Sequence, residues 1–366
     1  MKLPASWLAL QGPTLLFVLV TTILGAASET EPAFDESVAR EIVQLTEAAY
    51  CSAQLAGWNC TVCQSFPGMT NVSVLQGQSR NVRGFVGVDV GERTGEATST
   101  SQASAGQHSG LRALEDGLEG PGLPSSSKSR PRIVVTFSGT DPKSLKNWID
   151  DLEAAPIAHA YAGEGCSDCK VHRGFLAAYD VVQDQVRAAV AKHLRDNPDA
   201  EILITGHSLG GALATLCFLD LQLTLGSVPF APVYIFGAPR VGNEVFAKFS
   251  VSHAVPIYRV VHNRDPVPHL PFESWGYRHP PTEVFFDADQ TSYVVCDDSG
   301  EDETCSDQFW VGGRGVDECK GVVRSGASVR RCLTHFMSPD PDLPVDSGTR
   351  RTPTIKVVLP WCTELV

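Results

Sequence analysis

The sequence predicts an α/β fold with a mainly parallel central sheet and helices on both of its faces. Strand-like and helix-like segments alternate from residue 132 onward, which is typical of parallel sheets. Hydrophobic residues make up 43% of the 366 residues, enough for a sizeable core. Because α/β domains of this length are often single, we expect one domain over residues 28–366. The formal charge of −13 disfavours nucleic acids and anionic membranes as partners.

The first 27 residues have the features of a secretory signal peptide. Lys2 supplies a positive charge, residues 15–24 form a short apolar run, and small residues follow up to Ala27. A membrane anchor is the alternative, but this run is shorter than the roughly 20 residues that span a bilayer. We therefore expect a secreted, extracellular protein without a transmembrane anchor.

The elements before residue 140 are a helix and two strands. Asp35 is a suitable N-cap for a helix over residues 35–51, whose apolar face contains Val38, Ile42, Leu45 and Ala49. Strands are predicted at 84–90 and 132–139. Residues 94–131 are rich in small and polar residues and contain too few large apolar side chains to form a core. We expect them to be a disordered surface insertion that joins neighbouring strands.

Later in the chain the alternation is regular. A long amphipathic helix is predicted at 174–198 and an apolar helix at 209–225. The predicted strands are residues 200–206, 233–239 and 257–263.

A serine lies at one strand-to-helix junction. Residues 206–210 read Gly-His-Ser-Leu-Gly, a G-x-S-x-G motif with a strand before it and a helix after it. This motif places the hydroxyl of Ser208 on a sharp turn, where glycines on either side avoid collisions. An ordinary glycine-rich turn is the alternative, and the flanking elements favour a nucleophile.

A serine nucleophile needs a base, and the base needs an acid that orients it. Asp265 follows the strand at 257–263, in the proline-rich stretch "RDPVPHLP", and is the expected acid; a turn-forming Asp before proline is the alternative. His335 is the expected base because it lies late in the chain and close to Cys332. His279 is the main rival, and we expect it to have a structural role instead.

Eleven cysteines in an exported chain indicate disulfide bonds. Two C-x-x-C pairs raise structural zinc as an alternative, but they lie roughly a hundred residues apart. Cys217 follows the serine on its helix and is expected to be a buried free thiol. Asn59 and Asn71 stand in N-x-S/T sequons and are expected glycosylation sites.

The chain resembles the fungal-type class 3 triacylglycerol lipases over most of residues 35–337. The segments that carry the resemblance occur in the family's order: "AAYC", "WNCTVC", "GFVGVD", "IVVTFSGT", "NWIDDL", "CKVHRGFLAAY", "GHSLGGALA", "FGAPRVGN" and "NRDPVPHLP". The resemblance implies an α/β-hydrolase fold and a catalytic triad of Ser208, Asp265 and His335.

The resemblance also implies an oxyanion hole and a lid. Leu209 would donate one backbone N–H to the oxyanion, and Thr140 would donate a second; Thr140 as a plain strand-end residue is the alternative. The segment 141–152 matches the family's lid, and Leu145, Trp148 and Ile149 would share one helix face. That face would cover the active site in water, or else pack permanently against the core.

The disulfide pairing implied by the resemblance is Cys60–Cys63, Cys166–Cys169, Cys296–Cys305 and Cys51–Cys362. This leaves Cys319 to pair with Cys332. The 51–362 bond would tie the first helix to the tail and close nearly the whole mature chain.

Together these features predict a secreted serine ester hydrolase, a triacylglycerol lipase acting at a lipid–water interface through an acyl-enzyme. Neither a metal nor an organic cofactor is expected, since no H-E-x-x-H motif or phosphate-binding loop occurs. Two alternatives remain within enzymes, namely phospholipase A1 and feruloyl esterase activity on the same scaffold. A secreted lipid-binding or host-interacting protein without catalysis is the alternative from another class.

Overall fold

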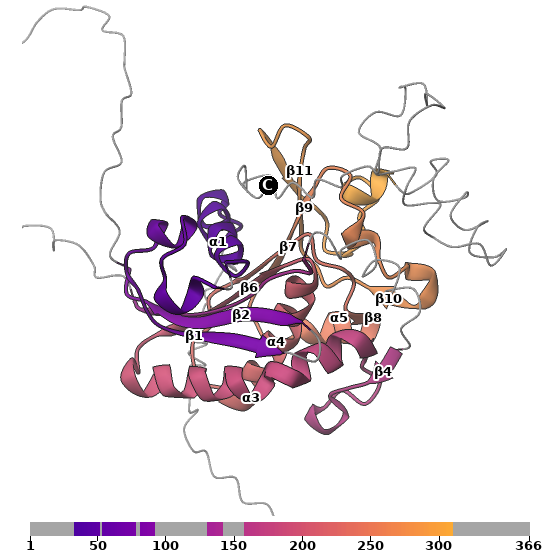
Figure 1. The fold of residues 1–366 in the computed structure, drawn as a ribbon. Coiled ribbons are helices and arrows are strands. Elements are labelled where there is room, and N and C mark those ends of the chain that lie inside the picture. Colours follow the sequence, from indigo (N-terminus) through magenta and orange to yellow (C-terminus); the bar gives the residue numbers. More distant parts are fainter. Residues whose placement is uncertain (1–32, 52, 78–80, 92–129, 142–156, 310–366) are drawn as a thin grey trace, which may run out of the picture. The chain divides into compact units, whose positions relative to one another are not determined.

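The structure is a computed structural model that describes residues 33–51, 53–77, 81–91, 130–141 and 157–309 (Figure 1). The chain divides into two compact units, Met1–Ala33 and Phe34–Val366, and all elements described below belong to the second. The predicted signal peptide lies outside the described residues, as does the predicted insertion up to residue 129.

An eight-stranded mixed sheet forms the centre of the fold, and its parallel part confirms the predicted fold class. Four neighbouring pairs are parallel, from β3 through β6, β7 and β9 to β11, while β1, β2 and β12 join antiparallel. The strands in spatial order are β1 (Met69–Gly77), β2 (Val82–Asp89), β3 (Arg132–Phe137), β6 (Glu201–His207), β7 (Val233–Phe236), β9 (Ile257–His262), β11 (Glu283–Phe286) and β12 (Tyr293–Val295).

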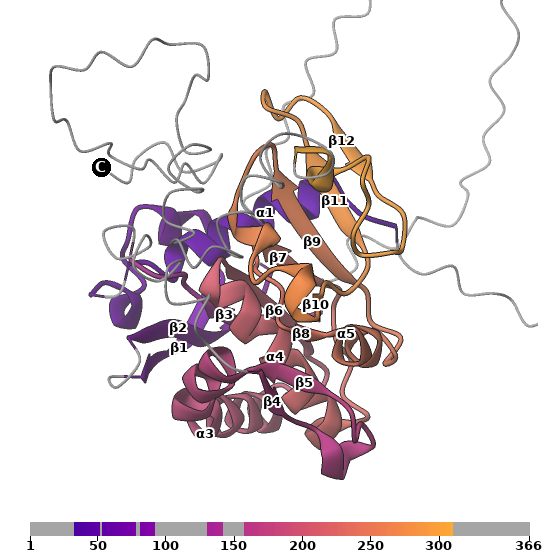
Figure 2. The same ribbon diagram turned by 90° about the vertical axis from the view of Figure 1, so that its right-hand side faces the viewer.

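Helices cover both faces of this sheet (Figures 1 and 2). Alternate residues of each strand point to opposite faces. On β3, Ile133 and Val135 belong to the core cluster shared with α3 and α4, whereas Val134 belongs to the cluster shared with α1. The helices are α1 (Glu36–Ala48), α3 (Arg173–Asp196), α4 (Leu209–Leu225) and α5 (Glu244–Ser250).

The helix ends follow from local chemistry. At the start of α1, Oδ1 of Asp35 accepts hydrogen bonds from the N–H groups of Ser37 (2.8 Å) and Val38 (3.2 Å), as expected of an N-cap. Helix α4 is apolar nearly all round because it lies buried between the sheet and α3, and it ends at Gly226, which has a φ of 43°. Of the described helices, none combines the length and apolar character that crossing a bilayer requires.

A second, smaller sheet was not predicted from the sequence. Its four strands pair antiparallel in the order β10 (Tyr277–Arg278), β8 (Gly242–Asn243), β5 (Lys170–His172) and β4 (Ile157–His159). Short 3₁₀ turns complete the described elements: η1 (Leu55–Gly57), η2 (Val62–Ser65), η4 (Ala162–Glu164), η5 (Val267–His269), η6 (Glu273–Trp275) and η7 (Ser306–Phe309).

Three disulfide bonds occur in the described residues: Cys60–Cys63, Cys166–Cys169 and Cys296–Cys305. Both C-x-x-C pairs are therefore bonded internally, which leaves no thiolates there for zinc. Cys217 is a fully buried thiol, and Cys51 forms no disulfide within the described residues. The predicted partner of Cys51, Cys362, lies outside those residues, as do Cys319 and Cys332.

Both predicted glycosylation sequons lie on the surface. Asn59 is exposed just before the Cys60–Cys63 bond. Asn71 is exposed at an irregularity in edge strand β1, with a φ of 53°.

Candidate active site

The predicted nucleophile lies at a strained turn between β6 and α4. Ser208 has φ 55° and ψ −124°, a conformation that costs a non-glycine residue about 1–3 kcal/mol. Its N–H donates to the carbonyl of Phe236 at 3.0 Å, which ties the turn to neighbouring strand β7. A serine at a helix N-cap usually bonds the first turn through its hydroxyl. Here the Ser208 side chain makes no capping bond, and its buried Oγ has no hydrogen-bond partner among the described residues.

The motif's two glycines are required by close packing around this turn. A Cβ on Gly206 would lie 2.1 Å from the carbonyl oxygen of Gly210, and a Cβ on Gly210 would lie 2.1 Å from that of Phe137. Both distances are far below van der Waals contact, so any larger residue would displace the turn or strand β3. The turn keeps its shape only with glycine at both positions.

The end of β3 packs directly against the turn. A Cβ built on Gly139 would lie 3.0 Å from Cβ of Ser208, so the residue directly before Thr140 packs against the serine. Oγ1 of Thr140 is buried and has no hydrogen-bond partner among the residues described. Leu209 begins α4, where the first N–H groups of a helix have no acceptor within the helix. These two residues are the predicted oxyanion-hole donors.

A tyrosine that the sequence analysis assigned no role joins the two sides of the site. The Tyr50 hydroxyl accepts a hydrogen bond from the N–H of Gly139 at 2.8 Å and contacts Nδ1 of His207 at 2.6 Å. Because Tyr50 accepts from Gly139, its own proton is available for Nδ1 of His207. Burial lowers the pKa of His207 to about 4, so this imidazole is neutral at pH 7 and can accept that proton. Tyr50 thus links α1, the serine turn and the loop after β3.

Asp265 follows β9, at the same edge of the sheet as Ser208. Because β6, β7 and β9 are adjacent parallel strands, their carboxyl ends lie together. Oδ1 of Asp265 accepts the N–H of Val267 at 2.9 Å. A Cβ on Gly237, which follows β7, would lie 2.6 Å from Oδ2 of Asp265 and 3.6 Å from Nε2 of His207. The carboxylate therefore lies beside the serine turn.

Burial raises the pKa of Asp265 to about 6, although the N–H of Val267 lowers it. The carboxyl group is thus ionised for the most part at pH 7, at a cost in free energy. A buried carboxylate in a functional cleft is suited to hold a cationic or hydrogen-bond-donating partner.

The structure describes only one of the two candidate bases. His335 lies outside the described residues. His279 is buried, and its Nε2 donates to the carbonyl of Pro268 at 2.7 Å. Burial, together with the charges of Arg259 and Arg240, lowers the pKa of His279 well below its usual value. His279 is therefore a neutral imidazole that holds a loop in place, in line with the structural role expected for it.

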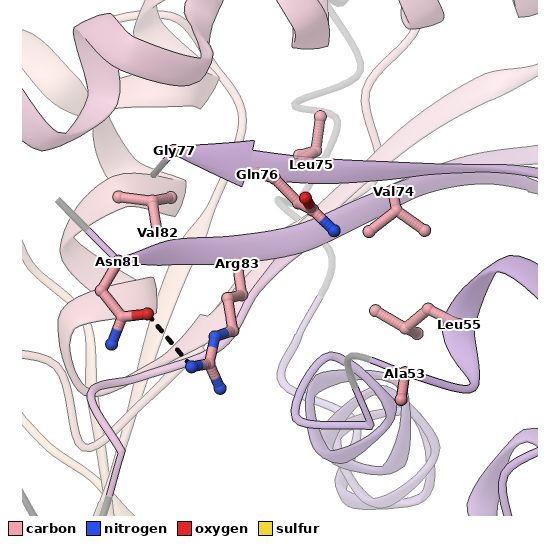
Figure 3. A pocket seen from close by; sticks show the side chains of 9 residues that line it. All are labelled: Ala53, Leu55, Val74, Leu75, Gln76, Gly77, Asn81, Val82 and Arg83. Carbon is pink, nitrogen blue, oxygen red and sulfur yellow. Dashed lines mark hydrogen bonds between the residues drawn. The ribbon is translucent and has the colours of Figure 1, made fainter. Parts of the chain in front are cut away.

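The predicted lid residues Leu145, Trp148 and Ile149 also lie outside the described residues. A pocket of about 370 Å³ opens elsewhere, between Ala53 and Leu55 on one side and residues 74–77 and 81–83 of the β1–β2 hairpin on the other (Figure 3). None of the candidate catalytic residues lines it.

Two groups of possible metal ligands occur among the described residues, and neither is available. One consists of Glu283 with Cys296 and Cys305, but these cysteines are bonded to each other. The other is formed by Glu273, Glu301 and Asp307, which surround the guanidinium of Arg240.

A mixed, mostly parallel sheet with a serine on a strained strand-to-helix turn defines an α/β-hydrolase fold. Comparisons with known proteins agree. Residues 134–275 match the family "Lipase (class 3)". The solved structure of Rhizomucor miehei triacylglyceride lipase is similar, with a TM-score of 0.58 and 26% identity over 78% of this chain and 94% of that one.

Curated relatives point to the same family. A lipase from Rhizomucor miehei is 36% identical over 50% of this chain and 49% of the relative. "Secreted mono- and diacylglycerol lipase 1" from Fusarium solani is 38% identical over 44% of this chain and 46% of the relative. The chain spans about half the length of the curated relatives it matches. With the structural match, these findings show that the chain is similar to the fungal class 3 lipases.

Proposed function

We propose that this protein is a secreted serine ester hydrolase that acts on acylglycerols, with Ser208, His335 and Asp265 as its catalytic triad. One observation carries the proposal. The Ser208 hydroxyl sits on a strained turn at the N-terminus of α4, buried, and makes neither a capping bond nor any other hydrogen bond among the described residues. Strain of this kind persists where function requires it.

The proposed reaction has two halves. Oγ of Ser208 attacks the ester carbonyl carbon while Nε2 of His335 takes the hydroxyl proton. The resulting oxyanion accepts hydrogen bonds from the N–H groups of Leu209 and Thr140, and the dipole of α4 stabilises its charge. The imidazolium of His335 returns the proton to the departing alcohol, which leaves an acyl group on Ser208. Water, deprotonated by His335, then attacks the acyl carbon; the bond to Oγ of Ser208 breaks, Oγ takes the proton back from the imidazolium, and the fatty acid is released.

The environment of Asp265 supports its role as the triad acid. Its carboxylate lies close to the serine turn and accepts one hydrogen bond from a backbone N–H. Its raised pKa indicates that these surroundings stabilise the negative charge only in part. A donor N–H and positive charge from an imidazole would compensate for its burial. His279 is a weaker candidate for that imidazole because its Nε2 already donates to Pro268.

Acylglycerols are the proposed substrates because the relatives' names describe a triacylglyceride lipase and a mono- and diacylglycerol lipase. The apolar helix face predicted from sequence for Leu145, Trp148 and Ile149 would suit a lipid–water interface. Proposed secretion is supported by the three disulfide bonds, which persist in oxidising compartments. It is also supported by the signal-like segment at residues 1–27 and by the word "secreted" in the name of one relative.

The test is a rate profile across tributyrin, triolein, phosphatidylcholine and methyl ferulate, each with and without an interface. We expect the acylglycerols to be hydrolysed fastest and Ser208→Ala to lose all measurable turnover. Preference for phosphatidylcholine would indicate phospholipase A1, and preference for methyl ferulate would indicate a feruloyl esterase. Turnover that survives in Ser208→Ala would refute the mechanism. His335→Ala and His279→Ala, compared for turnover at pH 7, decide between the two bases.

A further inference from the structure

We propose that the loop Gly237–Arg240, which leaves β7, positions the carboxylate of Asp265, and that Arg240 is its main positioning residue. The proposal rests on the function proposed above, because it assigns Asp265 to the catalytic triad. Neither Gly237 nor Arg240 is expected to touch the substrate. Their effect on the reaction would pass through Asp265 alone.

The first end of this loop lies against the carboxylate itself. Gly237 has a φ of 51°, a conformation that glycine adopts readily, and a Cβ at this position would lie 2.6 Å from Oδ2 of Asp265. The N–H of Gly237 donates to the carbonyl of Val260 on β9 at 2.9 Å. The missing side chain therefore creates the space that the carboxylate occupies.

The other end holds the segment that follows Asp265. The backbone N–H of Arg240 donates to the carbonyl of Leu270 at 2.8 Å, and its side-chain Nη1 donates to the carbonyl of Pro271 at 3.2 Å. His279 donates to the carbonyl of Pro268 at 2.7 Å, as described above. Three carbonyls in the segment 268–271 are thus held from outside it.

The buried guanidinium of Arg240 is itself fixed by an acidic cage of three carboxylates, from Glu301, Glu273 and Asp307. It is only 3% exposed, and it forms a bidentate pair with Glu301, from Nε at 2.9 Å and from Nη2 at 2.6 Å. Carboxylate oxygens of Glu273 and Asp307 lie 3.8 and 3.9 Å from Nη2. A planar, bidentate pair of this kind defines an orientation that lysine cannot reproduce.

The cage also connects to the segment held by Arg240. Oε1 of Glu301 accepts the N–H of His279 at 2.8 Å, and Oδ1 of Asp307 contacts Nδ1 of His269 at 2.9 Å. His269 belongs to the segment that follows Asp265, and His279 donates to the carbonyl of Pro268 in that segment. One ion pair, Arg240 with Glu301, therefore joins the β7 loop, the residues after Asp265 and the disulfide-closed segment 296–305.

A second arginine–carboxylate pair, in which the carboxylate of Asp220 is buried and Arg187 is exposed, provides a control. Asp220 on α4 accepts hydrogen bonds from Tyr179 at 2.8 Å, Gln183 at 3.1 Å and Arg187 Nε at 3.0 Å. This cluster joins α3 to α4. It contributes to stability but, among the described residues, makes no hydrogen bond or ion pair with the segment around Asp265.

The experiment measures kcat and KM on a soluble short-chain p-nitrophenyl ester, with the unfolding midpoint in urea for every variant. Arg240→Lys and Gly237→Ala should each lower kcat about 10- to 100-fold, the scale of a misplacement near 1 Å, with KM within twofold. Asp220→Asn should lower the unfolding midpoint and leave kcat within twofold of wild type.

A double-mutant comparison separates positioning from general damage. If Arg240 acts through Asp265, Arg240→Lys should cost no further activity in an Asp265→Asn background. A loss of the same size in both backgrounds would overturn the proposal, as would wild-type kcat in both single variants. Should Arg240→Lys fail to fold, Gly237→Ala and its double variant with Asp265→Asn decide the question. Activity that survives in Ser208→Ala would instead refute the proposed function.

Discussion

Replacing Tyr50 by phenylalanine removes one hydroxyl from the centre of the site. That hydroxyl accepts from the N–H of Gly139 and bonds to Nδ1 of His207, at 2.8 and 2.6 Å. A phenyl ring of the same shape fills the space but leaves both partners without this bond. Water has limited access, because His207 is 8% exposed and Gly139 packs against the serine turn.

The magnitude follows from the two groups left unsatisfied. A fully buried donor or acceptor without a partner costs about 1–3 kcal/mol. His207 is buried and Gly139 is half-buried, so we expect Tyr50→Phe to lower the free energy of unfolding by about 2 kcal/mol. Loss of a direct oxyanion-hole donor costs 10²- to 10³-fold in kcat. Tyr50 only holds the residue before Thr140, so its loss should cost about tenfold.

Urea unfolding and p-nitrophenyl butyrate turnover measure the two effects. Tyr277→Phe is the matched control, because the buried Tyr277 hydroxyl has no hydrogen-bond partner among the described residues. That variant should be as stable as wild type, or slightly more stable, with unchanged kcat. If Tyr50→Phe keeps wild-type stability and kcat, or if Tyr277→Phe is equally impaired, the assigned role of Tyr50 is wrong.

Three further predictions concern the serine turn, the buried acid and the α3–α4 interface. Gly210→Ala would place a Cβ 2.1 Å from the carbonyl oxygen of Phe137. It should reduce stability by about 1–3 kcal/mol and nearly abolish turnover, and wild-type activity would contradict the required packing. Burial raises the folded-state pKa of Asp265 to about 6, above its unfolded value of 3.8, so its ionisation destabilises the protein above pH 6 and ceases to do so below pH 3.8. Asp265→Asn should therefore gain stability relative to wild type as the pH rises from 4 to 7; urea unfolding at both pH values checks this, and an equal difference at both would contradict it. Asp220→Asn should lower the free energy of unfolding by about 2–3 kcal/mol, because Arg187 and Tyr179 lose a buried ionised partner, and an unchanged urea midpoint would refute this account.

The main elements could be predicted from sequence because their signals are local. The N-cap at Asp35 and the apolar run of α4 depend on neighbouring residues, and α4 spans the predicted residues 209–225. Strands β2, β3, β6, β7 and β9 were likewise predicted from apolar runs, whereas β1, with nine residues, was not. Strands β8 and β10, with two residues each, exist only because β5 and neighbouring loops bring pairing partners to them. Their sequences carry no pattern long enough to detect.

The candidate site was likewise predictable only in part. Ser208 is marked by glycines two positions away, and Asp265 by its place just after a strand. Tyr50 lies 157 residues from His207 in the sequence, and Arg240 lies 61 residues from Glu301. Such contacts depend on how the sheet brings distant loops together, and no local pattern reports them. The tyrosine occurs in a segment that resembles the family, which was the available signal, but the resemblance did not supply its role.

Covalent labelling tests the central claim most directly, namely that Ser208 is an activated nucleophile. The purified protein is treated with a fluorophosphonate, and the modified residue is located by peptide mass spectrometry while ester hydrolysis is followed. We expect one label per chain, on Ser208, with hydrolysis lost in proportion to labelling and no label on Ser208→Ala. Full hydrolysis after complete labelling of Ser208, or a label on another residue that alone abolishes turnover, would contradict the account.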